Sequence, residues 1–215
     1  MHYAARAAGI LCLLFIWSCN KTDIAPKTAP PTPSEPANTY LQLQTGHAWV
    51  YQSRNINLSA SDTTHLSKLD SIYVAADTLF DRARYYIQKG TRLGSTFESI
   101  LRVSGPEALD TAGQLYFSTE LNKGSFNVPE SLLPENVVSA RGSIDEGPEL
   151  TTPYGTFRTK AYAMEATFVP PGDTLVQGLR FDTLFFAPEV GLVRYVQHNP
   201  EQHLKVEMEL LRAYL

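Results

Sequence analysis

The stretch RFDTLFFAPEVGLVRYVQHNP (residues 180–200) is dense in hydrophobic residues. Two apolar, strand-like runs, Leu184–Ala187 and Leu192–Val196, flank the segment Pro188-Glu189-Val190-Gly191. Proline at the start of a turn with glycine at its end is typical of a type I turn. The stretch therefore predicts a β-hairpin. A second break at residues 198–202 would return the chain into a third strand and complete a three-stranded meander.

The C-terminal segment alternates apolar and charged residues from His203 to Leu210. Its apolar side chains fall on one face and its charged side chains on the other: Leu204, Val206, Met208 and Leu210 against Lys205, Glu207 and Glu209. This period of two predicts an amphipathic terminal strand. A short helix is the alternative, because Glu, Met and Leu are also good helix formers.

Other segments rich in β-branched and aromatic residues predict further strands. They lie at residues 49–53, 71–75, 85–88, 99–103 and 114–118, with a long strand over 156–169 that stops at the turn sequence of residues 170–173. The expected fold is all-β and mainly antiparallel, with eight to eleven strands. They would form a strongly curved sheet or incomplete β-barrel with at most one or two short helices.

The N-terminus carries an export signal over residues 1–18. One cation, Arg6, precedes an apolar run from Ala7 to Trp17, and the stretch has no acidic residue. This arrangement is typical of a secretory signal. A permanent transmembrane helix is the weaker alternative, because crossing a bilayer core needs about 20 apolar residues.

The end of this signal, Ile16-Trp17-Ser18-Cys19, resembles the lipobox of bacterial lipoproteins. The resemblance implies that Cys19 becomes the first mature residue and carries a diacylglycerol thioether. Cys12 lies in the removed segment, so Cys19 is the lone cysteine of the mature chain. A free thiol near a conventional cleavage site is the alternative. Two or three acyl chains would hold the protein stably on a membrane.

The residues after Cys19 are similar to the start of many lipoproteins of the Bacteroidota. Asn20 stands where an aspartate would signal inner-membrane retention, so the resemblance implies the outer membrane. The acidic content there is a single residue, Asp23, which leaves open whether the protein faces the periplasm or the cell surface.

A Pro-rich tether is expected over residues 19–38, followed by a single β-rich domain over 39–215. The tether holds five prolines and no aromatic residue, so it cannot bury a core. Extended polyproline II at about 3.1 Å per residue would let residues 21–38 reach up to roughly 50 Å. Loss of Arg6 with the leader takes the formal charge from −4 to −5, which argues against a nucleic-acid partner.

One further resemblance covers the beginning, middle and end of this domain. The run Phe186–Arg194, FAPEVGLVR, resembles a YAPGVGLVK signature of β-rich bacterial lipoproteins, with Glu189 in place of the first glycine. Residues 43–51 and 154–157 fit the same pattern. The resemblance implies a curved half-barrel similar to those of the lipoprotein carriers LolA and LolB.

The sequence offers no catalytic or cofactor motif. Gly124-Ser125 and Gly142-Ser143 lack the second glycine of a nucleophile elbow, and no phosphate-binding glycine loop is present. His198 and His203 superficially resemble a zinc motif, but Pro200 interrupts the helix that such a motif requires. We therefore expect no catalytic residue, cofactor or metal.

Six of the nine aspartates precede Ser or Thr and then an apolar residue or Thr. This pattern resembles the O-glycosylation sequon of the Bacteroidota, which implies sugars on Thr63, Ser71, Thr78, Thr111, Thr174 and Thr183. The alternative is structural, because an aspartate often caps a turn at the start of a strand. Both interpretations stay open, and only exposed copies are expected to be used.

Three functions follow as hypotheses. The first is a non-enzymatic binding module, whose 11 Tyr and 10 Phe line a concave face for a lipid or another hydrophobic ligand. The second is a structural or accessory subunit of an outer-membrane assembly, which would have an envelope protein as partner. A hydrolase is the least favoured, because it rests on loop carboxylates alone.

The anchor is directly testable by mass and fractionation. The mature protein should carry the mass of a lipidated Cys19 and sediment with membranes, and Cys19→Ala should abolish both properties. The same intact mass would exceed that of the bare lipidated chain if the sequons carry sugars. A Cys19→Ala protein that still fractionates with membranes would contradict the lipid anchor.

Overall fold

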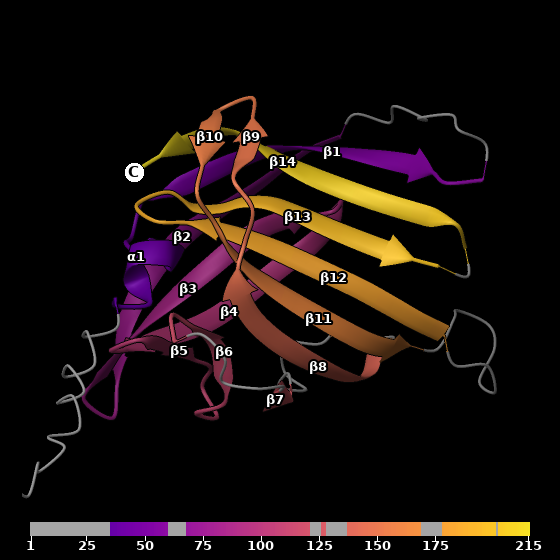
Figure 1. The fold of residues 1–215 in the computed structure, drawn as a ribbon. Helices are drawn as coiled ribbons and strands as arrows, with labels where there is room; N and C mark the ends of the chain where they lie inside the picture. Colours follow the sequence, from indigo (N-terminus) through magenta and orange to yellow (C-terminus); the bar gives the residue numbers. More distant parts are fainter. Residues whose placement is uncertain (1–34, 60–67, 121–125, 128–136, 169–177, 201) are drawn as a thin grey trace, which may run out of the picture. The chain divides into compact units, whose positions relative to one another are not determined.

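Fourteen strands and one short helix make up the described part of the chain (Figure 1). The structure is a computed structural model, and it describes residues 35–59, 68–120, 126–127, 137–168, 178–200 and 202–215. These residues belong to one compact unit, Pro33–Leu215. The leader, Cys19 and the tether up to residue 34 lie outside them. Within the described residues, no helix has the length and apolar character that crossing a bilayer requires.

The elements follow one another along the chain with few long connections. The first half contains α1 (Asn38–Leu41), β1 (Ala48–Asn57), β2 (Lys68–Phe80), β3 (Ala83–Arg92), β4 (Ser95–Ser104), β5 (Glu107–Leu109) and β6 (Leu115–Ser118). The second half contains β7 (Phe126–Asn127), β8 (Val137–Glu146), β9 (Leu150–Thr152), β10 (Gly155–Phe157), β11 (Lys160–Phe168), β12 (Gly178–Ala187), β13 (Gly191–Asn199) and β14 (Leu204–Tyr214).

Twelve strands form one antiparallel sheet in the order β6-β5-β4-β3-β2-β1-β14-β13-β12-β11-β8-β7. The first strand, β1, pairs with the last, β14, from Ala48–Tyr214 to Asn57–Leu204. We call this pairing the β1–β14 seam. It lies at the middle of the sheet, so each half of the chain forms one half of the sheet.

The sheet is strongly curved, and its two halves face each other across one core. The rings of Phe117 on β6 and Phe186 on β12 lie 5.0 Å apart, although many strands separate them in the sheet. The guanidinium of Arg92 on β3 lies 5.5 Å from the ring of Tyr195 on β13. Bulges in the β1–β14, β2–β3 and β12–β13 ladders add to the curvature. This confirms the predicted fold class.

The core lies on the concave face, where side chains of alternate residues meet. Along β12 every second residue from Gly178 to Phe186 is buried, as a strand with one buried face requires. Helix α1 closes part of this core with Tyr40 and Leu41, and the Tyr40 ring lies 6.0 Å from that of Phe117.

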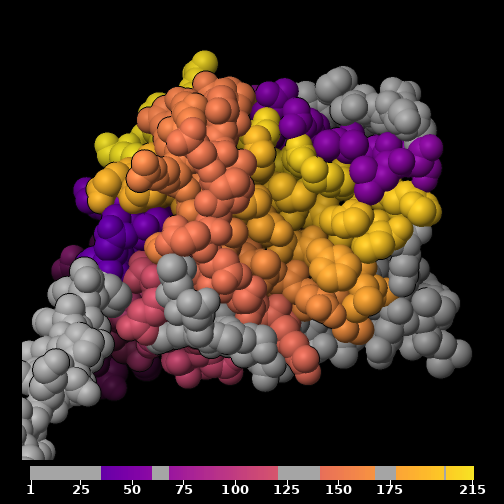
Figure 2. All heavy atoms as spheres, in the orientation of Figure 1, coloured from indigo at the N-terminus to yellow at the C-terminus, as the bar shows by residue number. Residues whose placement is uncertain are grey.

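An ion-pair network crosses the convex face of the β1–β14 seam. Glu207 and Glu209 of β14 both bind Arg54 of β1, at 2.5 and 3.3 Å, and Glu209 also binds Arg194 of β13 at 2.6 Å. Arg194 donates further to the Thr151 carbonyl oxygen at 3.2 Å. This bond holds the β9–β10 hairpin against the convex face, where it covers part of β13 and β14 (Figure 2).

The predicted hairpin of residues 184–196 is confirmed, but its turn type was wrong. The Val190 amide donates to the Ala187 carbonyl, and Glu189 has a φ of +60°. A left-handed third residue is typical of a type II turn, in which glycine is favoured. Glycine stands at this position in the signature that the hairpin resembles.

This turn is tied to three distant residues. The Glu189 amide donates to the Thr39 carbonyl at 2.7 Å. The Trp49 indole donates to the Val190 carbonyl at 2.6 Å, and the Tyr51 hydroxyl donates to the Leu192 carbonyl at 3.0 Å. The hairpin is therefore fixed to both α1 and β1.

The terminal strand is confirmed as β14, which excludes the helical alternative. The long strand expected over 156–169 was wrong: it is divided into β10 and β11, which lie in different sheets. Thr159 causes the division, because its hydroxyl donates to the Pro148 carbonyl at 2.7 Å and its own carbonyl accepts from Gly147. The strand count was too low because β5, β7, β9 and β10 have only two or three residues, too few for a visible alternation.

Contacts with the sheet begin slightly before residue 39, where we expected the domain to start. Ala37 is fully buried and its amide donates to the Gly105 carbonyl at 2.9 Å. Thr119 donates its hydroxyl to the Glu35 carbonyl. Residues 35–38, expected in the tether, thus pack against the folded unit.

The turn geometry predicts opposite effects at two neighbouring positions. Glu189→Gly should raise the free energy of unfolding by up to about 1 kcal/mol, because it relieves a left-handed non-glycine residue. Gly191→Ala should lower it by about 1–3 kcal/mol. Gly191 has a φ of +100°, and a Cβ there would lie 3.1 Å from Trp49 Nε1. Urea denaturation of both variants measures the effect, and a loss of stability in Glu189→Gly would contradict this account.

Candidate functional site

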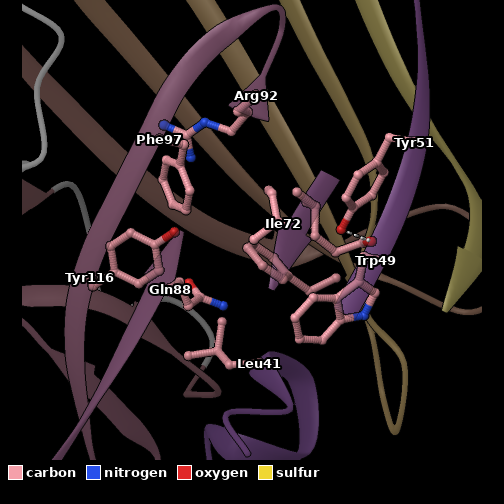
Figure 3. Close-up of a pocket in the computed structure, with 10 residues that line it drawn as sticks. Leu41, Trp49, Tyr51, Ile72, Gln88, Arg92, Phe97 and Tyr116 are labelled. Atoms are coloured by element: carbon pink, nitrogen blue, oxygen red, sulfur yellow. Dashed lines mark hydrogen bonds between the residues drawn. The ribbon is translucent and has the colours of Figure 1, made fainter. Parts of the chain in front are cut away.

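A small cavity lies inside the curved sheet, next to α1. Its volume is about 30 Å³, and its polar lining comes from Gln88, Arg92 and Tyr116 among apolar side chains such as Ile72 and Leu41 (Figure 3). A buried water needs about 10–15 Å³ of such volume, so this space suits one to a few waters. Small-molecule sites begin at about 300 Å³. The cavity therefore gives no support to a lipid held in this interior.

Aromatic rings hold Arg92 at one end of this cavity. Its guanidinium carbon lies 4.3 Å from the centre of the Phe97 ring and 5.5 Å from that of Tyr195. Figure 3 shows the Arg92 side chain above Phe97, with Tyr116 on the cavity side. These cation–π contacts join β3 and β4 to β13.

A buried ion pair lies on the concave face of β12. Arg180 Nε donates to Asp182 Oδ2 at 3.0 Å, and Arg180 Nη2 lies 2.9 Å from the same oxygen. Arg180 and Asp182 are two residues apart on one strand, so both side chains point to the same face. The Asp182 side chain is fully buried, and its Oδ1 has no hydrogen-bond partner among the described residues.

Burial dominates the electrostatics of this pair. It raises the pKa of Asp182 above the ordinary value, although Arg180 and Arg92 act in the opposite direction. Burial also raises the pKa of Tyr195, and the nearby Asp182 carboxylate adds to that increase. The pKa of Tyr162 is raised by burial first, then by Tyr116 and Asp182. This part of the interior thus places the Asp182 carboxylate near two guanidiniums and several phenols.

This cluster fits a structural role better than a catalytic one. A carboxyl with a raised pKa is a candidate general acid, but Asp182 is occupied by Arg180 and sealed from solvent. Across the described ranges, no group of three His, Cys, Asp or Glu side chains could hold a metal ion. His198 packs against Phe181 at 6.4 Å between ring centres, and His203 lies in the turn before β14.

The sequence-predicted sites fall partly outside this region. Cys19, Thr63 and Thr174 lie outside the described residues. Ser71, Thr78 and Thr111 are exposed, and Thr183 is half-buried on β12. The structure does not bring these residues together.

The aspartates of the four described sequons lie in different environments. Asp110 caps a turn, because its Oδ1 accepts from the amides of Ala112 and Gln114 at 2.9 and 2.8 Å. Asp70 accepts from Ser53 and from the Gly94 amide inside the sheet. Asp110 thus caps a turn, as the structural alternative expects, but Thr111 does not start a strand there. Within the described residues, Asp77-Thr78-Leu79 alone exposes all three sequon positions.

Sequence reasoning missed Arg92, Arg180 and Asp182 as interior residues. A sequence signal for two of them was present, because Arg180 and Asp182 lie at the same alternate positions of the strand as the buried Leu184 and Phe186. The position of Arg92 depends on contacts with β4 and β13, which local sequence does not encode.

No protein-family model matches the chain, and no curated protein matches it either. Among solved structures, it is similar to a protein of Parabacteroides distasonis proposed to be a lipoprotein. The identity is 12% over 85% of this chain and 100% of that chain, with a TM-score of 0.53. A protein of Bacteroides fragilis, proposed to be exported and described as having a YmcC-like fold, gives 13% identity. It covers 86% of this chain and 100% of that chain, with a TM-score of 0.48.

The first of these likenesses shows a shared fold and nothing more, because the identity is so low. The second lies too low in TM-score to carry an argument. Neither comparison points to LolA or LolB, so that resemblance stays an expectation.

Asp182 predicts a specific pH dependence of stability. Because its folded pKa lies above its unfolded value, its favourable contribution is present at low pH and is lost as pH rises above 3.8 through the folded pKa. The free energy of unfolding of the wild type minus that of Asp182→Asn should therefore fall over this range. Urea titrations at a series of pH values measure it. A difference that rises with pH would show that the Arg180 pair outweighs burial.

Proposed function

We propose that this protein is a lipid-anchored, non-enzymatic lipoprotein of the cell envelope, whose β domain acts as an accessory module of a larger assembly. The observation that favours an accessory role over a carrier is the filled interior, with a cavity of about 30 Å³ in the curved sheet. A partner would then be met on the outer surface of the domain.

The anchor is supported by the lipobox-like sequence ending at Cys19. The fold likeness to a protein of P. distasonis proposed to be a lipoprotein agrees with this assignment. Docking of residues 35–38 against the sheet leaves residues 19–34 as the linking segment. Asn20 favours the outer membrane, and either face of it fits the sequence.

A non-enzymatic role is supported by the state of the best-placed acid. Asp182 has the most favourable environment for acid catalysis, yet Arg180 binds it and its side chain has no exposed surface. A hydrolase would need a carboxylate that a substrate can approach. We therefore propose a role that depends on contacts with a partner protein and not on catalysis.

Binding of a lipid or another hydrophobic ligand inside the sheet is the alternative. It would require the cavity to expand about tenfold, to the roughly 300 Å³ at which ligand sites begin. Such an expansion would separate Arg92 from Phe97 or from Tyr195. A carrier would therefore have to break interior contacts before it could load.

O-glycosylation is proposed for the most accessible sequon, Asp77-Thr78-Leu79. Thr78 lies near the end of β2 with its neighbours exposed, so a folded protein could present it to a glycosyltransferase. Thr183 is the least suitable of the described positions, because its Asp182 and Leu184 neighbours are buried.

Native mass spectrometry of the detergent-extracted protein separates the two roles. An accessory subunit should appear in a complex larger than one chain, without any non-covalent lipid. A carrier should appear as a single chain with bound lipid, which would contradict the accessory role. Cys19→Ala serves as a control, since it removes the covalent lipid mass and leaves the interior unchanged.

A further inference from the structure

The end of the β2–β3 hairpin projects beyond the core. Along most of β2 buried and exposed residues alternate, but the last four residues, 77–80, are all exposed. Leu79 and Phe80 have exposed fractions of 71% and 69%. Adjacent residues of a strand point to opposite faces, so exposure of both means that neither face is covered there.

The turn that follows is tight and well defined. Asp81 and Arg82 have φ values of +47° and +62°, and Phe80 pairs directly with Ala83. Two left-handed residues between paired strands form a type I′ turn, which matches the twist of the hairpin. The Phe80 ring packs edge-on to Tyr85 at 6.2 Å. We call residues 79–82 the hairpin tip.

The hairpin tip lies at the end of the sheet from which the chain leads towards Cys19. Strand β4 runs antiparallel to β3 and ends at Ser104, beside the start of β3. The next residue, Gly105, accepts the hydrogen bond from the Ala37 amide. The β2–β3 hairpin, the β4–β5 turn and residues 35–37 therefore share one end (Figure 1).

We propose that the hairpin tip inserts Leu79 and Phe80 into the bilayer surface to which Cys19 anchors the chain. The inference rests on the proposed lipid anchor. The segment of residues 19–34 can span at most roughly 50 Å when extended, so the end of the sheet at residue 35 can reach the membrane that holds Cys19. An apolar side chain at that surface is buried in the headgroup and acyl boundary.

The charges around the hairpin tip favour apolar insertion over attraction to anionic lipid. Arg84 lies 3.4 Å from Asp77, and Asp81 and Arg82 carry opposite charges. The tip has no net charge, so its membrane contact should depend little on anionic headgroups. The insertion would fix the orientation of a domain that the tether alone leaves free to rotate.

Tryptophan quenching tests the contact in the lipidated mature protein. Phe80→Trp and Leu69→Trp are compared in vesicles of phosphatidylethanolamine with and without phosphatidylglycerol, made with brominated acyl chains. Leu69 is the matched control, because it is 69% exposed on the same strand but lies at its other end. The Phe80→Trp protein should lose fluorescence relative to unbrominated vesicles in both lipid mixtures, and Leu69→Trp should not.

The outcomes separate the hairpin tip from the anchor. Vesicle-bound protein with equal, weak quenching at both positions would overturn the tip contact and leave the anchor intact. Protein that fails to float with the vesicles would refute the anchor and, with it, the membrane contact. Quenching that occurs only with phosphatidylglycerol would contradict insertion through apolar contacts, because it would depend on anionic headgroups. The double variant Leu79→Ser/Phe80→Ser and the control Leu69→Ser should both keep the wild-type melting temperature measured by circular dichroism. On vesicles, but not in solution, protease should cleave the double variant near Arg82 faster than it cleaves the control.

Discussion

The β1–β14 seam holds the curved sheet together. It joins the two halves of the sheet, and each of its faces has a separate source of stability. Met208 and Leu210 are fully buried on the concave side, while Arg54 binds Glu207 and Glu209 on the convex side. Burial acts to raise the pKa of Glu207, but the hydrogen bonds from Lys205 and Arg54 outweigh it and hold that pKa below its ordinary value. The curvature that follows brings β3 to β13 and β6 to β12, which creates the core.

The filled core changes how the aromatic content of the chain should be understood. The many tyrosines and phenylalanines suggested an apolar ligand-binding face. Three of them, Tyr51, Phe117 and Phe186, instead pack in the hydrophobic core between the two halves of the sheet. Polar groups also lie in the described interior, among them Asp70 and the Arg180–Asp182 pair. A buried pair of this kind contributes little net stability, but removing one partner leaves an uncompensated charge. The partner contact that we propose therefore lies on the outer surface of the domain.

Much of the fold could be predicted because alternation is local. The β12–β13 hairpin and the amphipathic β14 follow from residue patterns that span only a few positions. The type II turn could not be derived from local sequence. Glu189 keeps its left-handed backbone because its amide donates to the Thr39 carbonyl and the Trp49 indole donates to the Val190 carbonyl, and both partners are far away in sequence. The break at Thr159 was missed for the same reason, since it depends on Pro148. The candidate site was predicted least well: the aspartate of the Asp182-Thr183 sequon proved to be an interior charge, and the projection of Leu79 and Phe80 depends on where the core ends.

The central position of the β1–β14 seam also has a consequence for biogenesis. Ala48 pairs with Tyr214, so the contact that unites the sheet links nearly the two extremes of the domain. Contacts of such long sequence separation form late and slowly. A polypeptide emerging N-terminus first across a membrane cannot complete its central ladder until its final eleven-residue strand has followed. In the exported lipoprotein that we propose, this order of strands would delay formation of the sheet until the last strand has been threaded.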